Sequence, residues 1–331
     1  MKRASHIDGQ PETVSGYRFQ TDDLRVADRQ PGISAFLRIR NGADFLELAI
    51  RSHIEYFDEI VAVYNQCTDE TPDILMRMQQ EFGPVKLRVF HYTDRVFPPG
   101  SEGHVRTDPT SPNSLVNYYN FALAATRHRF AVKLDDDHLA IAAATKSTTD
   151  AIRAGGAGAD TMHCFSGLNV FFRADGSLGI LQRDAISGSG DIGFFQVTPQ
   201  TCFTHDRRFE RFQRGGVKRC FTGFLYWHLK NLKVDMGFGN YELAQNPSGR
   251  YAKRRFALQN GSIRTIDLKE LAASRQPSRF NRLQQLVSEK CALAAVRDAA
   301  IATTFPDQSV AEAIRRTVAP QFHAAILSLH D

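Results

Sequence analysis

Apolar and polar residues follow two alternating patterns along the first part of the chain. Four short apolar runs predict buried strands, at 33–39, 59–64, 85–91 and 130–134. Apolar positions at helical spacing predict the helices between them, at 43–57, 70–82 and 114–128. Because strands that alternate with helices form a parallel sheet covered on both faces, these patterns predict an α/β fold with a Rossmann-like sheet.

The rest of the chain has a less regular pattern. It predicts hairpins that cover a cleft at 160–200 and helices at 140–154, 223–232, 283–300 and 310–329. A long segment rich in Pro, Gly and Ser, at 94–114, is expected to be an active-site loop. We therefore predict an N-terminal arm at 1–32, a main domain at 33–240 with halves at 33–140 and 141–240, and a helical C-terminal extension at 241–331.

Composition narrows the class of protein. The 331 residues are 42% hydrophobic and 23% charged, which suits one large folded domain with a smaller appendage. The net charge of +5 suits an anionic substrate, an anionic membrane surface or nucleic acid, and does not choose among them. Five cysteines without metal-ligand spacing predict reduced thiols in a cytoplasmic protein. No apolar leader and no stretch of about 20 apolar residues is present, so any membrane association is expected to be peripheral, on the inner membrane face.

Three consecutive carboxylates, Asp135, Asp136 and Asp137, follow the strand predicted at 130–134. Like charges this close repel each other, so a cation or the solvent must relieve the cost. Open α/β sheets bind ligands at the carboxyl ends of their strands, where carboxylates and substrate phosphates can share a divalent ion. Alternation along a strand would place Asp135 and Asp137 on one face and Asp136 on the other. The alternative is an acidic surface turn.

The sequence that leads to these carboxylates resembles the GT-A glycosyltransferases, in particular the family 2-like bacterial sugar transferases. The resemblance covers 33–140 and rests on Asp44-Phe-Leu-Glu47, Glu59–Val63, Thr68-Asp-Glu-Thr71 and Leu134-Asp-Asp-Asp137, the last as a DxD motif. It implies a GT-A fold, a nucleotide-sugar donor, and Mn²⁺ or Mg²⁺ as cofactor. It also implies a glycan or lipid-linked glycan acceptor, inversion at the transferred sugar, and a role in bacterial surface polysaccharide synthesis.

Two departures from the family concern the nucleotide. Leu37-Arg-Ile-Arg-Asn41 stands where the family usually carries an apolar-Pro-Thr-Tyr-Asn run. Tyr64-Asn65 stands where the second strand usually ends in a carboxylate that recognises the base. The resemblance therefore leaves the donor nucleotide open.

The resemblance also implies roles for individual residues. Asp137 would bind the metal, Asp135 would bind the donor ribose or the metal through water, and Asp136 would belong to the donor site. His228 would complete the metal shell from the C-terminal side. The residues expected around the diphosphate, base and ribose are Arg38, Arg40, Asn65 and Asp69. Alternation predicts that at least one of the two arginines points to solvent.

Transfer with inversion needs a general base beside the acceptor hydroxyl. No Glu-Asp pair stands where the family often carries one, and the candidates are Asp191, Asp206 and Glu210. Asp191 is preferred because it lies in a glycine-rich loop, where a ligand can approach the backbone closely. The alternative for Asp191 is a turn residue of a hairpin.

Other residues keep a structural and a functional interpretation. Tyr226 and Trp227 would stack on an acceptor sugar or belong to the core. The basic run at 250–255 would face solvent or hold an anionic acceptor or membrane surface. Lys133 is expected to pair with a carboxylate. His138 is expected to be a helix-capping or surface residue, and the alternative is a further metal ligand or a proton carrier.

Other classes of protein stay in competition. A haloacid-dehalogenase-like phosphatase places its nucleophilic Asp on the first strand, whereas three predicted strands precede Asp135. A nucleotidyltransferase normally opens with a glycine-rich phosphate loop, and Arg38-Ile-Arg-Asn41 is not one. A non-catalytic carbohydrate- or nucleic-acid-binding protein would suit the basic charge, but no aromatic-basic signature predicts a nucleic-acid partner. The oligomeric state is left open.

Overall fold

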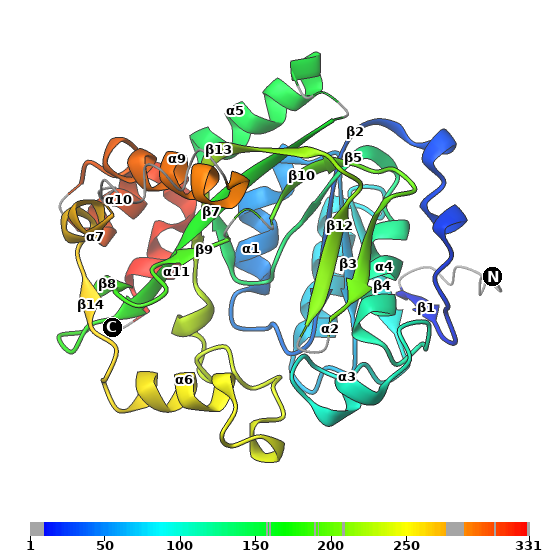
Figure 1. The fold of residues 1–331 in the computed structure, drawn as a ribbon, viewed down its shortest axis with the longest axis horizontal. Coiled ribbons are helices and arrows are strands. Elements are labelled where there is room, and N and C mark those ends of the chain that lie inside the picture. The colour runs from blue at the N-terminus through cyan, green and yellow to red at the C-terminus, as the bar shows by residue number, and fades with distance from the viewer. Residues whose placement is uncertain are drawn as a thin grey trace.

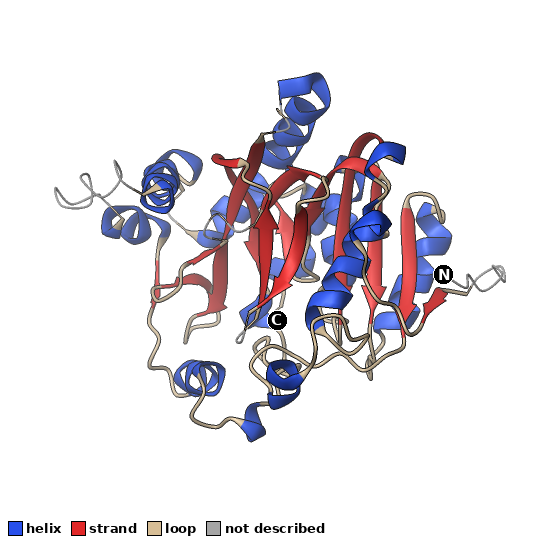
Figure 2. Cartoon of the chain, turned by 45° about the vertical axis from the view of Figure 1, so that its right-hand side comes forward, coloured by secondary structure: helices blue, strands red, loops and turns tan. Residues whose placement is uncertain are grey.

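The computed structural model describes residues 10–156, 158, 160–188, 190, 192–206, 209–275, 288–307 and 309–329. In this part of the chain, twelve strands form one sheet through the middle of the molecule, and helices pack on both of its faces (Figure 1, Figure 2). A two-stranded hairpin lies beside the sheet. This is the α/β class that the sequence predicted, with a large Rossmann-like sheet.

The N-terminal half of the sheet is parallel. Its strands lie in the order β1 (Glu12–Val14), β4 (Leu87–Tyr92), β3 (Glu59–Tyr64), β2 (Gln30–Ile39) and β5 (His128–Lys133). The helices between them are α1 (Leu46–His53), α2 (Thr71–Phe82), α3 (Glu102–Arg106) and α4 (Leu115–Ala124). The four predicted strands and three predicted helices of this half are confirmed, although the helix predicted at 114–128 ends before β5 begins.

Alternate residues of β2 point into two separate apolar layers. Ile33, Ala35 and Leu37 lie in the layer that contains α1 and α2, whereas Phe36 lies in the layer that contains α4. Every residue of β3 is also buried. Burial on both faces explains why these strands appear in the sequence as continuous apolar runs.

The C-terminal half of the sheet is mixed. Strand β10 (Gly193–Gln196) runs antiparallel to β5 and to β7 (Thr161–Phe172). Strand β13 (Lys218–His228) runs parallel to β7 and antiparallel to β6 (His138–Ala140). The remaining strands are β8 (Leu178–Leu181), β9 (Ile186–Ser187) and β14 (Thr265–Ile266), with β11 (Thr201–His205) and β12 (Glu210–Arg214) in the hairpin. The strands expected at 160–200 are confirmed, but they extend the central sheet.

Helices make up much of the remaining chain. They are α5 (Ala142–Ala151), α6 (Arg250–Gln259), α7 (Leu268–Ser274), α9 (Glu289–Thr304), α10 (Val310–Thr317) and α11 (His323–Leu327). Short 3₁₀ segments occur at Thr21–Leu24, Val26–Asp28, Ile54–Tyr56, Lys230–Leu232, Leu243–Gln245 and Pro320–Phe322, and a π-helical turn at Ile152–Gly156. None of the helices in the described part of the chain combines the length and the apolar character that a membrane crossing requires.

The helical C-terminal extension is confirmed, with one change. Helices α7, α9, α10 and α11 gather on one side of the molecule, at the left of Figure 1. The helix predicted at 310–329 is interrupted at Pro320, because a proline disfavours helical backbone in the residue before it. The first residues of the helix predicted at 283–300 lie outside the described residues. The domain boundaries stay predictions.

The helix predicted at 223–232 is wrong. The chain up to His228 belongs to β13, and only Lys230–Leu232 form a short 3₁₀ turn. The end of β13, residues 224–227, is buried on both faces, because Tyr226 lies in the layer of α1 and α2 and Trp227 lies in the layer of the C-terminal helices. In a short run that is apolar on both faces, the spacing of apolar residues does not distinguish a strand from a helix. The aromatic residues of this run favour a strand.

Candidate active site

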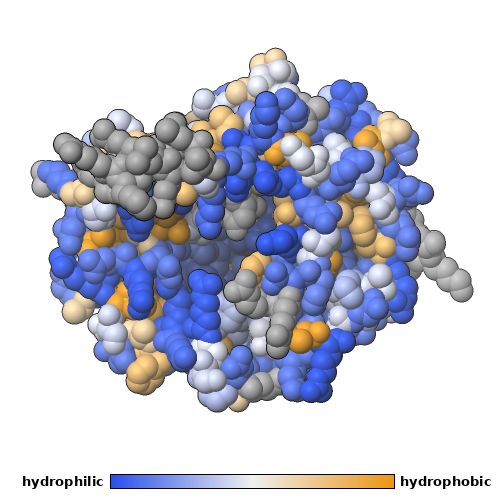
Figure 3. Space-filling view, in the orientation of Figure 1, coloured by the Kyte–Doolittle hydropathy of each residue, from blue (hydrophilic) through white to orange (hydrophobic). Residues whose placement is uncertain are grey.

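A cleft of about 800 Å³ opens at the carboxyl ends of β2, β3 and β5. Arg38 and Arg40 reach it from the end of β2, and Asn65 from the end of β3. The hairpin β11–β12, Tyr251 of α6 and Lys290 of α9 border its other sides. Figure 3 shows a hollow near the middle of this face, surrounded largely by hydrophilic residues. The fold thus brings residues from distant parts of the sequence to one cavity.

Basic side chains outnumber acidic ones on the cleft wall. Among the described lining residues, the basic ones are Arg38, Arg40, Lys133, Arg211, Arg214, Arg219, Lys230, Lys233 and Lys290. The acidic ones are Asp135, Asp136, Asp137, Glu210 and Asp235. The wall as a whole therefore favours an anionic ligand, while three of its acidic groups are concentrated directly after β5.

The three consecutive carboxylates form a turn. Strand β5 ends at Lys133, and the backbone N–H of His138 donates to the carbonyl of Asp135 at 3.3 Å. All three carboxylates line the cleft. The prediction that Asp136 points away from Asp135 and Asp137 is wrong, because side chains alternate between two faces only while the backbone stays extended.

Each carboxylate of the turn has a basic partner. Asp135 lies 3.1 Å from the Arg38 guanidinium and 3.4 Å from Lys133, so the pairing expected for Lys133 is confirmed. Lys233 Nζ lies 2.9 Å from Asp136 Oδ2 and 3.1 Å from Asp137 Oδ2. The repulsion within the acidic turn is therefore relieved by basic side chains from other segments of the chain.

These surroundings separate the pKa values of the carboxylates. Burial raises the pKa of Asp136 to about 6. The negative charge of Asp137 raises this pKa further, whereas the Lys233 ammonium lowers it. Burial also disfavours the charge of Asp137, but the Lys233 ammonium holds its pKa well below the usual value. The pKa of Asp135 is likewise lowered, because Lys133 and other basic neighbours outweigh its burial. Two ionised carboxylates thus flank one that holds its proton more readily.

The two arginines at the end of β2 both line the cleft. Arg38 lies with its guanidinium 3.4 Å from the centre of the Tyr119 ring, and its side chain is only 7% exposed. The Nε atoms of Arg38 and Arg40 are buried and make no hydrogen bond with any described residue. The prediction that one arginine points to solvent is wrong, because residues two apart on a strand share a face. Both side chains keep donors available for an anionic group.

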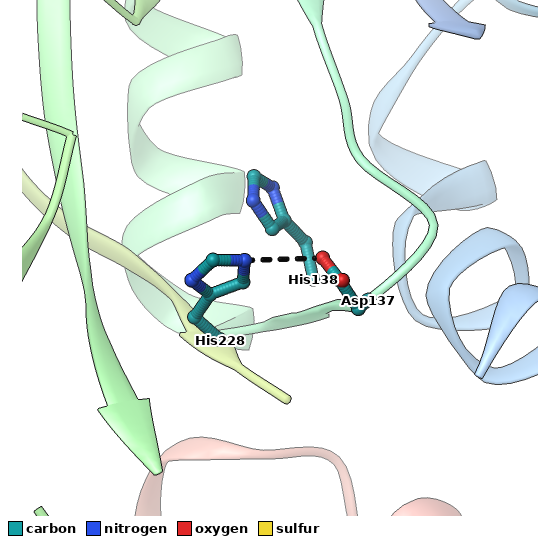
Figure 4. A group of neighbouring side chains, drawn as sticks. All are labelled: Asp137, His138 and His228. Carbon is teal, nitrogen blue, oxygen red and sulfur yellow. Dashed lines mark ion pairs between the residues drawn. The ribbon is translucent and has the colours of Figure 1, made fainter. Parts of the chain in front are cut away.

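Strand register brings two histidines to Asp137. In the pairing of β13 with β6, His228 stands opposite His138. In the pairing of β13 with β7, His228 stands opposite Asn169. His228 Nδ1 donates to Asn169 Oδ1 at 2.5 Å, and Asn169 Nδ2 donates to the Asp184 carbonyl at 2.5 Å, which fixes the orientation of the amide. His228 Nε2 then faces Asp137 Oδ1 at 3.1 Å (Figure 4).

A divalent metal ion fits these side chains. Ligand atoms from Asp137, His138 and His228 lie within 4.8 Å of one another. Asp137 Oδ1 and both ring nitrogens of His138 are buried and have no hydrogen-bond partner among the described residues. Burial lowers the pKa of His138 to about 3, so this ring is neutral and keeps a nitrogen lone pair. A cation between these atoms would satisfy acceptors that otherwise face one another.

His138 is therefore not the surface or helix-capping residue that the sequence predicted. It lies on β6 with 1% exposure, and its ring stacks on Tyr226 with the ring centres 3.7 Å apart. Tyr226 and Trp227 are themselves core residues, with 1% and 0% exposure. The Trp227 indole N–H donates to Thr317 Oγ1 at 3.0 Å, away from the cleft. Of the two interpretations open for these aromatic residues, the structure shows the core.

Two residues expected at the nucleotide serve the backbone. Asn65 Nδ2 donates to the carbonyls of Tyr92 and Asp94, both at 2.7 Å, and thereby holds the start of the 94–114 loop at the cleft. Asp69 accepts from the backbone N–H groups of Ala43 and Thr71, at 3.0 and 3.1 Å. Asn65 lines the cleft, whereas Asp69 is not among the described residues that do so.

The three candidates for the general base have different positions. Glu210 begins β12 and lines the cleft, as Tyr119 and Arg38 do. Asp206 binds through its backbone, with its carbonyl accepting from His104 Nε2 at 2.9 Å, and it is not among the described lining residues. Asp191 lies outside the described residues. Of the two candidates that the structure describes, Glu210 is the one that lines the cleft.

The basic run at 250–255 lies on α6, at the edge of the cleft. Arg254 pairs with Asp184, and Tyr251 lines the cleft. Sequence reasoning missed Lys233 and Asn169, whose neighbours in the structure are distant in sequence. The available signal for Lys233 was its position just after the strand that carries His228.

Comparisons with known proteins give distant structural likenesses. No protein-family profile matches the sequence, and no curated protein matches it. TarS of S. aureus, residues 1–349, is 12% identical with a TM-score of 0.31, over 82% of this chain and 89% of that one. A mycobacterial protein is 15% identical with a TM-score of 0.24, over 47% of this chain and 45% of that one. The 4-diphosphocytidyl-2C-methyl-D-erythritol synthase of Anaerococcus prevotii is 13% identical with a TM-score of 0.22, over 55% and 68%. The residues of the cleft therefore carry the functional assignment.

Proposed function

We propose that this protein is a metal-dependent glycosyltransferase that moves a sugar from a nucleotide-sugar donor to a glycan or lipid-linked glycan acceptor. The observation that carries the proposal is the Asp137–His138–His228 cluster at the edge of a basic cleft, where the parallel strands end. A cleft of about 800 Å³ is large enough for a nucleotide sugar. Inversion at the sugar and a role in bacterial surface polysaccharide synthesis belong to the same proposal.

Asp137, His138 and His228 would hold the metal ion, and Asn169 would keep the His228 ring in place. Two imidazoles and one carboxylate suit Mn²⁺ better than Mg²⁺, which prefers an all-oxygen shell. When bound, the metal would supply Lewis-acid stabilisation of the leaving diphosphate.

The basic side chains of the cleft would bind and orient the donor. Arg38 and Arg40 carry buried Nε donors that suit the oxygens of a diphosphate. Asp135, fixed by Arg38 at 3.1 Å, would accept from a ribose hydroxyl. Stacking on Tyr119 holds the Arg38 guanidinium before the donor arrives, so little ordering is left for the binding step.

Glu210 would accept the proton of the acceptor hydroxyl. It lies on the hairpin that borders the cleft, so an acceptor bound in the cleft would have its hydroxyl near this carboxylate. Asp191 and Asp206 stay further candidates for this role.

A panel of UDP-, GDP-, CMP- and dTDP-sugars, each with Mn²⁺, Mg²⁺ or EDTA, tests the proposal by thermal shift. A ligand that binds only the folded state raises the melting temperature. At a ligand concentration of 100 times its Kd, the free energy of unfolding increases by about 2.7 kcal/mol. We expect one nucleotide family to raise it, most strongly with Mn²⁺. Acceptor-dependent release of the nucleoside diphosphate from a UDP-, GDP- or dTDP-sugar, or of CMP from a CMP-sugar, would show sugar transfer. A nucleotidyltransferase would instead need a nucleoside triphosphate and a sugar phosphate and would release pyrophosphate, and a phosphatase would release inorganic phosphate. If no nucleotide sugar changes the melting temperature in any buffer, the proposal fails.

A further inference from the structure

Lys233 lies inside the acidic turn. It follows the short 3₁₀ segment at Lys230–Leu232, just beyond β13, and its side chain is 9% exposed. Its Nζ contacts Oδ2 of both Asp136 and Asp137, at 2.9 and 3.1 Å. The backbone N–H of Leu229 also donates to the Asp137 carbonyl at 2.8 Å. The segment after β13 is therefore attached to the acidic turn by its main chain and by this lysine.

The surroundings keep Lys233 charged. A lysine side chain is a cation at neutral pH, and this ammonium lies against two carboxylates at 2.9 and 3.1 Å. A buried ammonium with two carboxylate partners is a fixed positive charge of the cleft.

Asp137 separates two cation positions. Its Oδ2 contacts the Lys233 ammonium, whereas its Oδ1 faces His228 Nε2 at 3.1 Å without a hydrogen bond to any described residue. An ion held by Oδ1 and the two histidines would share this carboxylate with the ammonium. Two positive charges that share one carboxylate repel each other, so each weakens the binding of the other.

On the basis of the proposed function, we propose that Lys233 is a resident cation of the donor site, which competes with the divalent ion for Asp137 and holds part of a nucleoside diphosphate by itself. The cleft is then neutralised before any metal arrives. The divalent ion would then bind more weakly than it would to Asp137, His138 and His228 without the lysine. The diphosphate would also keep some affinity for the cleft when no metal is bound.

The first experiment measures Mn²⁺ binding without nucleotide, by titration calorimetry. Lys233→Gln removes the charge but keeps a hydrogen-bond donor for Asp136, and it should bind Mn²⁺ about tenfold more tightly than the unmodified protein. Lys233→Arg keeps the charge and should bind like the unmodified protein. Lys146→Gln is the control, because Lys146 pairs with Asp150 on the exposed surface of α5. Equal or weaker Mn²⁺ binding by Lys233→Gln would overturn the competition.

The second experiment measures UDP and GDP binding in EDTA and in Mn²⁺. The unmodified protein should bind one of them in EDTA, and Lys233→Gln should weaken that binding about tenfold, with a smaller loss in Mn²⁺. If Lys233→Gln binds the nucleotide in EDTA as well as the unmodified protein does, the diphosphate part is overturned. If the unmodified protein binds neither nucleotide in either buffer and no nucleotide sugar of the panel raises its melting temperature, the proposed function fails together with this part. The Mn²⁺ titration still decides whether Lys233 competes for Asp137. If Lys233→Gln does not fold, both titrations are made on Lys233→Met, which also removes the charge and keeps a long unbranched side chain.

Discussion

Replacing Asn169 by Leu would remove the hydrogen bond that orients His228 and leave the proposed metal ligands unchanged. Asn169 lies on β7 beside His228 in the strand register and is 8% exposed. Its Oδ1 accepts from His228 Nδ1 at 2.5 Å, which leaves His228 Nε2 toward Asp137. Leu has nearly the same size but accepts no hydrogen bond, so the ring would be free to rotate or to change the nitrogen that carries its proton.

The size of the effect follows from these contacts. Loss of a hydrogen bond to a metal-binding imidazole reduces metal affinity by about 10- to 100-fold. That range corresponds to about 1.4–2.8 kcal/mol of binding free energy. The substitution also leaves the carbonyl of Asp184 without the Asn169 Nδ2 donor, and the free energy of unfolding should fall by about 1–3 kcal/mol.

A second variant separates the two effects. Asn169→Asp keeps an acceptor for His228 Nδ1 but loses the donor to Asp184, so both variants should melt at a lower temperature. Titration calorimetry with Mn²⁺ should show weaker binding for Asn169→Leu, and binding at least as tight as that of the unmodified protein for Asn169→Asp. If Asn169→Leu binds Mn²⁺ unchanged, or if both variants lose the same affinity, orientation of His228 by Asn169 is refuted.

Three other predictions concern the cleft and the sheet. Asp137→Asn should abolish the Mn²⁺-dependent part of the thermal shift by nucleotide sugars, because it removes the carboxylate of the cluster; an unchanged shift would contradict the metal site. Glu210→Gln should lower kcat about 10²- to 10⁴-fold while the donor Kd stays within about threefold, and a change in Kd instead would place Glu210 in the donor site. Burial opposes the charge of Glu59, but hydrogen bonds that include those from His128 and Ser34 lower its pKa to about 2. Because the pKa of Glu59 is lower in the folded state than in the unfolded state, its ionised form stabilises the fold at a pH above the unfolded pKa. The free energy of unfolding should therefore fall by about 3 kcal/mol as the pH falls from about 4.5 to about 2. Urea unfolding at several pH values should show this loss in the unmodified protein and a smaller one in Glu59→Gln, and equal pH dependence in both would contradict it.

The parallel half of the sheet could be predicted because local patterns specify it. Strand β3 has the predicted bounds, 59–64, because all of its residues are buried and polar segments flank it. Helix α2 begins at Thr71, where a Pro in the first turn and the Asp69 side chain favour a helix start. The position of the three carboxylates after β5 followed from the same local information.

The rest of the site depends on strand register, which a single sequence does not specify. Asn169 meets His228 because β7 and β13 pair side by side, and Lys233 meets Asp137 because the end of β13 is bonded to the acidic turn. The backbone contacts of Asp69 could not be predicted either. A loop carboxylate that accepts backbone N–H groups at a helix start has the same sequence appearance as one that binds a ribose.

The candidate site lies where the sheet changes from parallel to mixed. Strand β5 runs parallel to β2 on one side and antiparallel to β10 on the other, and the turn at Asp135–Asp137 leads from β5 into β6. One side of this turn meets Arg38, and the other meets His228 and Lys233. Open α/β sheets bind ligands at such changes of strand order, because the chain leaves a crevice there. The N-terminal half alone would contain the acidic turn and the arginines but neither partner of Asp137, so the cation chemistry of this cleft requires both halves of the sheet.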